Sequence, residues 1–582
     1  MGFFKSFFAS CLGTLVALVA LVILMIVFIT SLTSESPVAL KDNSVLHLKL
    51  DAAITEQEFE DPISEIYPQA GNESMGLIQL KQVLKNASTD GSIKGIYLNV
   101  AELATGFSTV EEVRNAILDF RTSGKWVIAY STSYSEGAYY LASASDKVYL
   151  FPDGQIEFNG LATEVTFFKK LFDKLEIKPQ VFRVGDFKSA VEPFIREDLS
   201  EENKLQLNSL LNSIYDEMLV KISESRKIPK DKLKKISEEM IVRNAKLAVE
   251  NKLVDSLFYE DQVKSDIKNR IGIAESEDIS FISYAKYRKT FSSTASSGNE
   301  IAVIVAEGEI TSGEASQGVV GSETIIKEIR KARTDDDVKA IVLRINSPGG
   351  EFVASDEMWR EVTLATEAKP VIASMSDYAA SGGYYLAMAC DTIVAQPNTI
   401  TGSIGIFSIL FDLSSFLDDK IGVTSEEVKT GRFGQMFTMT RPLTEIEKSI
   451  WQKQTEDVYE TFTRKASEGR KMSQDEIKKI ASGRVWTGSQ AKSNGLVDVL
   501  GGFDDAVRIA ADQANVSDDF KLRYYPVQKN FLERLAGGWE EETKTRMLKK
   551  ELGNYYAGYQ QWLGVKDYQG TQARMPFEFV LR

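Results

Sequence analysis

A segment that occurs twice is the feature that most constrains the fold of this chain. The sequence STSYSEGAYYLASASD (131–146) returns as SDYAASGGYYLAMACD (376–391), with 8 of 16 positions identical and an offset of 245 residues (376 against 131). At the same offset, KAIVLRINSPGGEFVASDEM (339–358) matches KGIYLNVAELATGFSTVEEV (94–113). Matches that keep one order and one spacing indicate that a whole domain has been duplicated.

Each copy alternates short apolar runs with amphipathic stretches. In the second copy the runs IAVIVAEGEI (301–310), AIVLRIN (340–346) and PVIASM (370–375) are rich in β-branched residues, which is typical of buried parallel strands. The stretches between them carry the apolar spacing of helices. This alternation predicts an α/β fold, built as a tandem duplication of one domain.

The N-terminal region predicts a membrane anchor. No charged residue lies between Ser6 and Ser34, and a membrane span needs about 20 apolar residues. The apolar region of a cleaved signal peptide is shorter, about 7–15 residues, and a small-residue cleavage site follows it. No such site follows here, so we expect one uncleaved transmembrane helix in contact with membrane lipid. Lys5 favours a cytoplasmic N-terminus, with the rest of the chain on the other side of the membrane.

Composition and repeats together predict five parts. The polar segment STASSGNE reads as a linker between the copies. The chain beyond about residue 516 matches neither copy, and we assign it no role. The expected parts are an anchor (1–40), a first repeat (41–292), the linker (293–300), a second repeat (301–515) and a C-terminal extension (516–582).

The charge and the metal-binding residue types exclude several functions. Lys plus Arg total 68 against 83 Asp plus Glu, a net charge of −15, which argues against nucleic acid as a partner. The chain has one histidine, His47, and two cysteines, Cys11 and Cys390. These three residues suffice neither for an ordinary zinc site nor for a disulfide framework. A carboxylate-only Mg²⁺ or Ca²⁺ site stays open, but no loop signature indicates one, so we expect no cofactor.

The two copies differ where chemistry would occur. Ser381 follows a predicted strand and begins a helix-like run, a position typical of a nucleophile, and it aligns with Glu136 of the first copy. Lys188 of the first copy aligns with Gly434 of the second. One copy therefore has the serine without the lysine, and the other has the lysine without the serine. This complementary loss predicts one site built from both copies, either within one chain or between neighbouring subunits.

A buried lysine can take the proton of a serine hydroxyl where no histidine is available. Its pKa must fall from about 10.4 to about 7–8, a change of about 3–4 kcal/mol that burial beside apolar groups can supply. The carboxylates of Asp186 and Glu192, close to Lys188 in sequence, would raise that pKa. We therefore expect both to point away from the lysine.

Small residues around the serine predict donors for an oxyanion. The N–H of Gly382, together with that of Gly349 or Gly350, is expected to form the oxyanion hole. Removing one such donor typically costs about 3–4 kcal/mol of transition-state stabilisation.

The motifs RINSPGG, DYAASGGYYLAMACD, TGSIG and GDFKSAVEPFIRE together resemble the signal peptide peptidase A family in its long tandem form. The resemblance covers roughly residues 45–515. It implies a Clp protease/crotonase-like fold, a bacterial inner-membrane protein facing the periplasm, a homotetrameric assembly and hydrolysis of apolar peptides such as leftover signal peptides. For the site it implies Ser381 as nucleophile, Lys188 as general base, Ser403 as the residue that orients the lysine, and an oxyanion hole from the glycines of SPGG and Gly382.

Two other functions stay open. A non-catalytic membrane scaffold would bind peptides in the same groove without cleaving them. A crotonase-like enzyme would hold the enolate of an acyl thioester in the same oxyanion hole, but this reading leaves Ser381 and Lys188 without a purpose.

Overall fold

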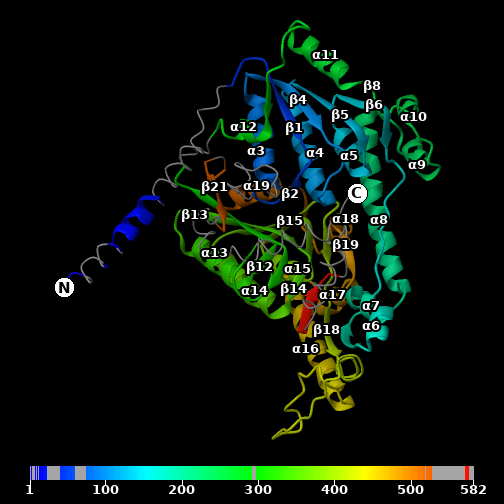
Figure 1. Ribbon diagram of the computed structural model, residues 1–582, viewed down its shortest axis with the longest axis vertical. Coiled ribbons are helices and arrows are strands. Elements are labelled where there is room, and N and C mark those ends of the chain that lie inside the picture. The colour runs from blue at the N-terminus through cyan, green and yellow to red at the C-terminus, as the bar shows by residue number, and fades with distance from the viewer. Residues whose placement is uncertain are drawn as a thin grey trace.

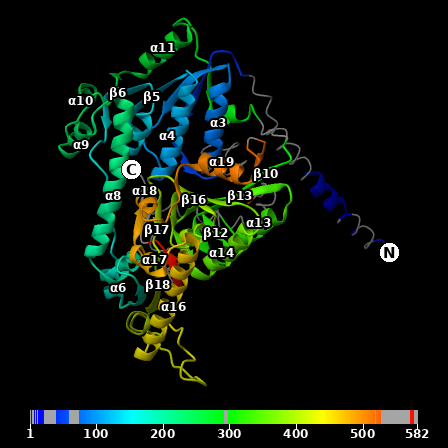
Figure 2. The same cartoon turned by 180° about the vertical axis from the view of Figure 1, so that it is seen from behind.

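The structure of the chain is a computed structural model. It describes residues 40–58, 74–291, 297–316, 318–517, 519–526 and 570–575, with scattered positions between 2 and 21. Figures 1 and 2 show the two repeats packed against each other, with the long helix α8 (Glu201–Arg226) running beside both.

The predicted duplication is confirmed by two parallel sheets of the same topology. β4 and β13 begin 245 residues apart (338 against 93), the offset that the sequence repeats give. The first sheet has the order β8 (Ser256–Leu257), β6 (Lys147–Ile156), β5 (Trp126–Tyr134), β4 (Ile93–Asn99), β1 (Ser44–Lys49) and β9 (Phe281–Ser283). The second has the matching path β20 (Val499–Leu500), β16 (Thr392–Ala395), β15 (Val371–Ala380), β13 (Val338–Ser347), β10 (Glu300–Glu307) and β21 (Lys521–Tyr525).

Two strands differ from the sequence prediction. The expected run over 301–310 breaks at Gly308, whose φ of 110° bends the chain between β10 and β11 (Glu309–Thr311). β15 continues past residue 375 to Ala380, because its last residues pair with β17 (Ile400–Gly402). The second sheet also extends past the boundary expected at residue 515, since β21 pairs with β10 as β9 pairs with β1.

A third sheet joins the two repeats. β7 (Lys178–Val184) comes from the first repeat and pairs antiparallel with β18 (Ile406–Asp412) of the second. The apolar side chains of this region form one cluster that contains Phe172 and Phe194 from the first repeat and Phe407 and Phe411 from the second. The order of the sheet is β12 (Val319–Gly321), β11, β14 (Gly349–Glu351), β22 (Gly570–Arg574), β18 and β7.

Helices cover the sheets, and the two longest begin at side-chain caps. Each repeat continues into a helix of 26 residues, α8 and α16 (Glu445–Arg470), and the side chains of Ser200 and Thr444 cap their first turns. The other helices of the first repeat are α3 (Leu77–Thr89), α4 (Phe107–Thr122), α5 (Glu136–Ala142), α6 (Lys169–Leu175), α7 (Glu192–Ile195), α9 (Lys230–Glu238), α10 (Ala245–Glu250), α11 (Glu260–Ile271) and α12 (Tyr284–Arg288). Those of the second are α13 (Ser322–Thr334), α14 (Phe352–Thr366), α15 (Gly382–Ala387), α17 (Gln474–Ile480), α18 (Gly488–Ser493) and α19 (Phe503–Gln513).

Most of the expected anchor and of the C-terminal extension lies outside the described residues. Over the part of the chain that is described, no helix combines the length and the apolar character that a membrane crossing requires. The five-part division and the likeness to the Clp protease and crotonase fold stay predictions.

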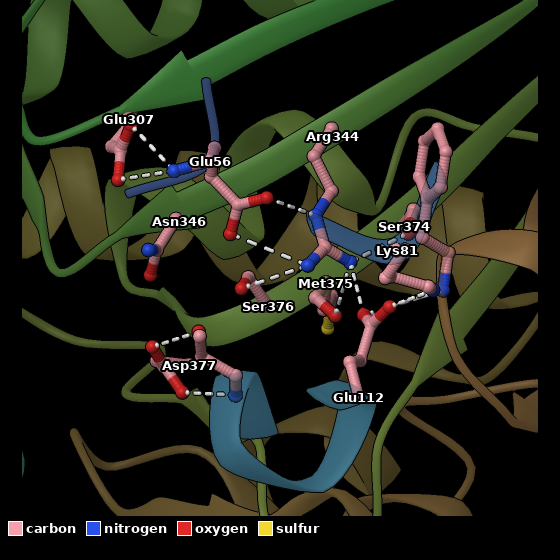
Figure 3. A network of polar contacts seen from close by, with 12 residues as sticks. Glu56, Lys81, Glu112, Glu307, Arg344, Asn346, Ser374, Met375, Ser376 and Asp377 are labelled. Atoms are coloured by element: carbon pink, nitrogen blue, oxygen red, sulfur yellow. Dashed lines mark hydrogen bonds and ion pairs between the residues drawn. The ribbon is translucent and has the colours of Figure 1, made fainter. Parts of the chain in front are cut away.

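A buried ion network joins the two repeats and contacts β15 through Ser374 and Ser376 (Figure 3). Arg344 of β13 is fully buried and forms ion pairs with Glu56 at 2.7 Å and Glu112 at 2.9 Å, both from the first repeat. Burial alone would raise the pKa of Glu112, but the charges of Arg344 and Lys81 lower it to about 2. Asp377 of β15 makes a further link by accepting hydrogen bonds from Thr109 at the start of α4.

Removing the Glu112 carboxylate should destabilise the chain strongly. Glu112→Gln leaves the fully buried Arg344 charge partly unpaired, and we expect the free energy of unfolding to fall by about 3–5 kcal/mol in urea titrations. Asp504→Asn is the matched control, because Asp504 also pairs with Lys81 but its side chain is 77% exposed. We expect that change to cost less than about 1 kcal/mol, and equal losses for the two variants would contradict the assigned role of the network.

Candidate active site

Ser381 occupies a sharp turn between β15 and α15, which confirms the predicted strand–turn–helix. Its φ of 54° and ψ of −110° are strained for a non-glycine residue. The turn is held by the N–H of Ser381, which donates to the carbonyl of Gly402 at 2.8 Å. The side chain is fully buried. The backbone therefore adopts an unfavourable conformation, and this conformation fixes the direction of the Ser381 hydroxyl.

Lys188 reaches the serine from the end of β7. The Phe187 N–H donates to the carbonyl of Ser482 at 3.0 Å, which anchors the loop that follows β7. The Nζ of Lys188 lies 2.9 Å from Ser381 Oγ. The structure thus brings the two complementary groups together within one chain.

Ser403 supplies the other polar contacts of the lysine. Its Oγ and its carbonyl oxygen lie 3.1 and 3.2 Å from Lys188 Nζ. Ser403 has a φ of 50°, and its N–H donates to the carbonyl of Arg484 at 2.8 Å. Because both oxygens accept from the same amine, Ser403 restricts the direction in which the amine can point.

The lysine lies in surroundings that favour its uncharged form. Burial holds the pKa of the Lys188 amine well below its ordinary value of 10.5. Asp186 is exposed to solvent, and Glu192 accepts hydrogen bonds from Ser200 and, at 2.9 Å, from Asn203. Among the described residues no carboxylate forms an ion pair with Lys188. The expectation that Asp186 and Glu192 point away is confirmed.

The glycine pair lies against the start of α15. Gly349 has a φ of 101°, and a Cβ there would come within 2.7 Å of the Gly382 nitrogen. The N–H of Gly349 donates to Ser347 Oγ at 3.2 Å. Gly350 is the next residue of β14. The backbone of Gly349 therefore lies against Gly382, the residue after Ser381, and the oxyanion hole expected from these glycines stays a prediction.

The corresponding turn of the first repeat holds an acid in place of the serine. Glu136 begins α5 and accepts hydrogen bonds from the N–H groups of Asn159 and Gly160 at 3.2 and 2.9 Å. Burial raises its pKa to about 7. The first repeat therefore contributes a lysine to the site. At its own turn, Glu136 stands in the place of the serine and is held by hydrogen bonds from Asn159 and Gly160.

Two glycines pack against the lysine: Gly483, which no sequence motif indicated, and Gly405, the last residue of the motif TGSIG. Gly483 has a φ of 78°, and a Cβ there would come within 2.6 Å of Lys188 Cβ. A Cβ on Gly405 would come within 3.3 Å of Lys188 Cδ. The available signal was the pair Ser482-Gly483 between a helix and a strand, which from sequence reads only as a turn.

Comparison with known proteins identifies relatives along most of the chain. A model of peptidase family S49 matches residues 119–274 and 363–517, one segment in each repeat. The chain is 36% identical to "Serine protease SPPA, chloroplastic" of Arabidopsis thaliana, over 78% of this chain and 68% of that protein. It is 38% identical to "Protease 4" of Salmonella typhi, over 78% of this chain and 75% of that protein.

Two further matches cover less of the chain. "Putative signal peptide peptidase SppA" of Enterococcus faecium is 31% identical over 42% of this chain and 65% of that protein. Among solved structures, a point mutant of ClpP1 from Listeria monocytogenes covers 35% of this chain and 94% of its own, with 18% identity and a TM-score of 0.24. A score this low carries no argument about the fold.

The buried amine should make stability depend on pH. Between the lowered pKa of Lys188 and 10.5 the unfolded chain binds a proton that the folded chain lacks, so this group makes stability rise with pH, by up to about 1.4 kcal/mol per pH unit. In Lys188→Met this contribution is absent. The free energy of unfolding of the variant, measured in urea, should therefore exceed that of the wild type by more at about pH 7 than at about pH 10. Lys85→Met, at an exposed position, is the control. A gain independent of pH would contradict a depressed lysine pKa.

A methyl group at residue 483 should displace the lysine. Gly483→Ala combines a positive φ with a clash against the Lys188 backbone, and we expect peptide cleavage to fall at least about 10-fold. Gly495→Ala has the same backbone cost, with a φ of 86°, but faces only the flexible Met472 side chain. Both variants should lose about 1–3 kcal/mol of stability, while only the first loses activity. Equal activities would show that Gly483 does not position Lys188.

Proposed function

The chain belongs to peptidase family S49, and from this membership we propose that it is a membrane-anchored endopeptidase with a Ser381/Lys188 dyad. It is a serine peptidase, as the family and the relatives named serine protease and Protease 4 establish. The observation that carries the dyad is the 2.9 Å contact between Lys188 Nζ and Ser381 Oγ, at a place where burial lowers the pKa of the amine.

In the proposed reaction the neutral amine of Lys188 takes the proton of Ser381 as Oγ attacks the carbonyl carbon of a peptide bond. The oxyanion accepts hydrogen bonds from the N–H of Gly382 and from one of the SPGG glycines, Gly349 or Gly350. The Lys188 ammonium then gives its proton to the leaving amine, and a water molecule hydrolyses the ester by the same path in reverse. Ser403 is a positioning residue, because it acts only by holding the amine towards Ser381.

The proposed substrates are apolar peptides, most specifically signal peptides left after cleavage. The name of the Enterococcus faecium relative supports this substrate class, as does the resemblance of the motifs. The uncharged run between Ser6 and Ser34 supports a single-pass anchor in contact with lipid. We place the protein in a bacterial inner membrane, with the catalytic part on the periplasmic side, as a homotetramer that needs no cofactor.

Single substitutions test the dyad. Ser381→Ala and Lys188→Ala should each lower kcat/KM for an apolar fluorogenic peptide by about 10³-fold or more, because each removes a group without which the other does not act. Ser493→Ala and Lys85→Ala, at exposed positions, should change little. For the wild type, kcat/KM should rise with pH through the pKa of Lys188 and then level off, since only the neutral amine is a base.

Three results would contradict this function. Near-normal cleavage by Lys188→Ala would remove the lysine from the mechanism. Turnover of an acyl thioester that survives Ser381→Ala would favour the crotonase-like alternative. A wild-type protein that binds unfolded peptides without cutting them would favour a scaffold.

A further inference from the structure

The backbone of Lys188 forms a tight turn. Its φ of −76° and ψ of 72° are those of the central residue of an inverse γ-turn. The Ser189 N–H accordingly donates to the Phe187 carbonyl at 2.8 Å. A three-residue turn has a single hydrogen bond of its own, so the direction of the Lys188 side chain also depends on what holds Phe187 and Ser189.

The side chain of Gln206, in the second turn of α8, contacts both neighbours of the lysine. Its Nε2 donates to Ser189 Oγ at 2.8 Å and to the Phe187 carbonyl at 3.2 Å. Its Oε1 accepts from the N–H of Val485 in β19 (Val485–Thr487) at 3.4 Å. Gln206 is fully buried. One side-chain amide therefore connects the turn at the lysine with a strand of the second repeat.

A buried carboxylate fixes which way this amide faces. Glu192 is fully buried and accepts hydrogen bonds from the Ser200 N–H at 3.3 Å and from Asn203 Nδ2 at 2.9 Å. Both donors lie at the start of α8, where the helix dipole favours a negative charge. Because Nδ2 of Asn203 faces Glu192, its Oδ1 faces Gln206 and accepts from Nε2 at 3.0 Å. The order of donors and acceptors from Glu192 to the turn at the lysine is thus determined at each step.

The second repeat has an apolar residue at the place of this amide. Ser200 and Thr444 are the N-caps of the two 26-residue helices. Six residues after the cap (206 against 200, 450 against 444), the first repeat has Gln206 and the second has Ile450. The second repeat also has Gly434 where the first has its lysine. The amide therefore occurs in the repeat that supplies the proposed base, and the other repeat has lost both polar groups.

We propose that Gln206 is a positioning residue for the proposed reaction, which holds the turn at Lys188 so that the amine faces Ser381 and stays out of water. The inference rests on the proposed function and adds to it a residue of α8 that acts only through Lys188. Loss of the amide would leave a buried carbonyl and a buried hydroxyl without this partner, and the turn would change conformation to satisfy them. The amine would then lie farther from Ser381 Oγ and meet more solvent, which favours its charged and inactive form.

Replacing the amide by an apolar side chain of similar length tests this role. In the full chain, Gln206→Met should lower kcat for an apolar fluorogenic peptide at least about 10-fold and change KM less than about threefold. The rise of kcat/KM with pH should move upward by about one pH unit or more, since a lysine in contact with water has a higher pKa than a buried one. A defect of packing alone would lower activity without moving this rise.

Two further variants separate positioning from the docking of α8. Ser213 lies on the same helix and shares a hydrogen bond with Thr487 Oγ1 at 2.9 Å, so it joins α8 to β19 away from the turn at the lysine. Ser213→Ala is the matched control: kcat should stay within about twofold of the wild type, and the pH of the rise should not move. Ser189→Ala removes only the acceptor that lies 2.8 Å from Gln206 Nε2. It should lower kcat and move the rise in the same direction as Gln206→Met, by a smaller amount.

The pH profiles decide the outcome. A rise that stays at the wild-type pH in both Gln206→Met and Ser189→Ala would overturn the proposal, as would an equal shift in Ser213→Ala. If circular dichroism shows that Gln206→Met does not fold, the profile of Ser189→Ala decides alone. Near-normal cleavage by Lys188→Ala would refute the dyad, and the role of Gln206 would fail with it. Normal cleavage by Gln206→Met beside an inactive Lys188→Ala would refute this inference and leave the proposed function standing.

Discussion

The antiparallel pairing of β7 with β18 is the interaction on which the site depends. β7 belongs to the first repeat and β18 to the second, and their register runs from Lys178 opposite Asp412 to Val184 opposite Ile406. A slip of one residue would turn every side chain of β7 to the other face of the sheet. The lysine four positions beyond Val184 reaches the serine only because main-chain hydrogen bonds between the repeats hold this register.

The site keeps several groups in states that cost free energy. The amine of Lys188 is desolvated, and Ser381 and Ser403 both have positive φ, which costs about 1–3 kcal/mol for each residue. Such states persist only where the surroundings are rigid. The network around Arg344 and the pairing of strands from both repeats provide that rigidity. The contact between Lys188 and Ser381 is therefore already formed in this structure, as the proposed reaction requires if it is to stabilise charge in a transition state without reorganisation.

The third sheet also completes the pairing of strands from both repeats. Without a strand between them, β14 and β18 would each present an unpaired edge, and such edges pair readily with other chains. β22 covers both edges and brings Ala573 to the glycine pair. The same backbone pairing thus protects both edges.

The sequence by itself determined the two-repeat α/β architecture, because buried parallel strands and a duplicated domain leave local patterns that need no tertiary information. It also predicted that Ser381 and Lys188 belong to one site, since each repeat lacks what the other keeps. Only the tertiary structure decided that these two groups meet within one chain, that Gly483 forms the wall behind the lysine, and that residues 570–575 enter the sheet. These facts depend on contacts between residues far apart in the chain. Main-chain hydrogen bonds between strands hold these contacts in place. Because the backbone carries the same donors and acceptors whatever the side chains are, the sequence does not indicate which strands will pair.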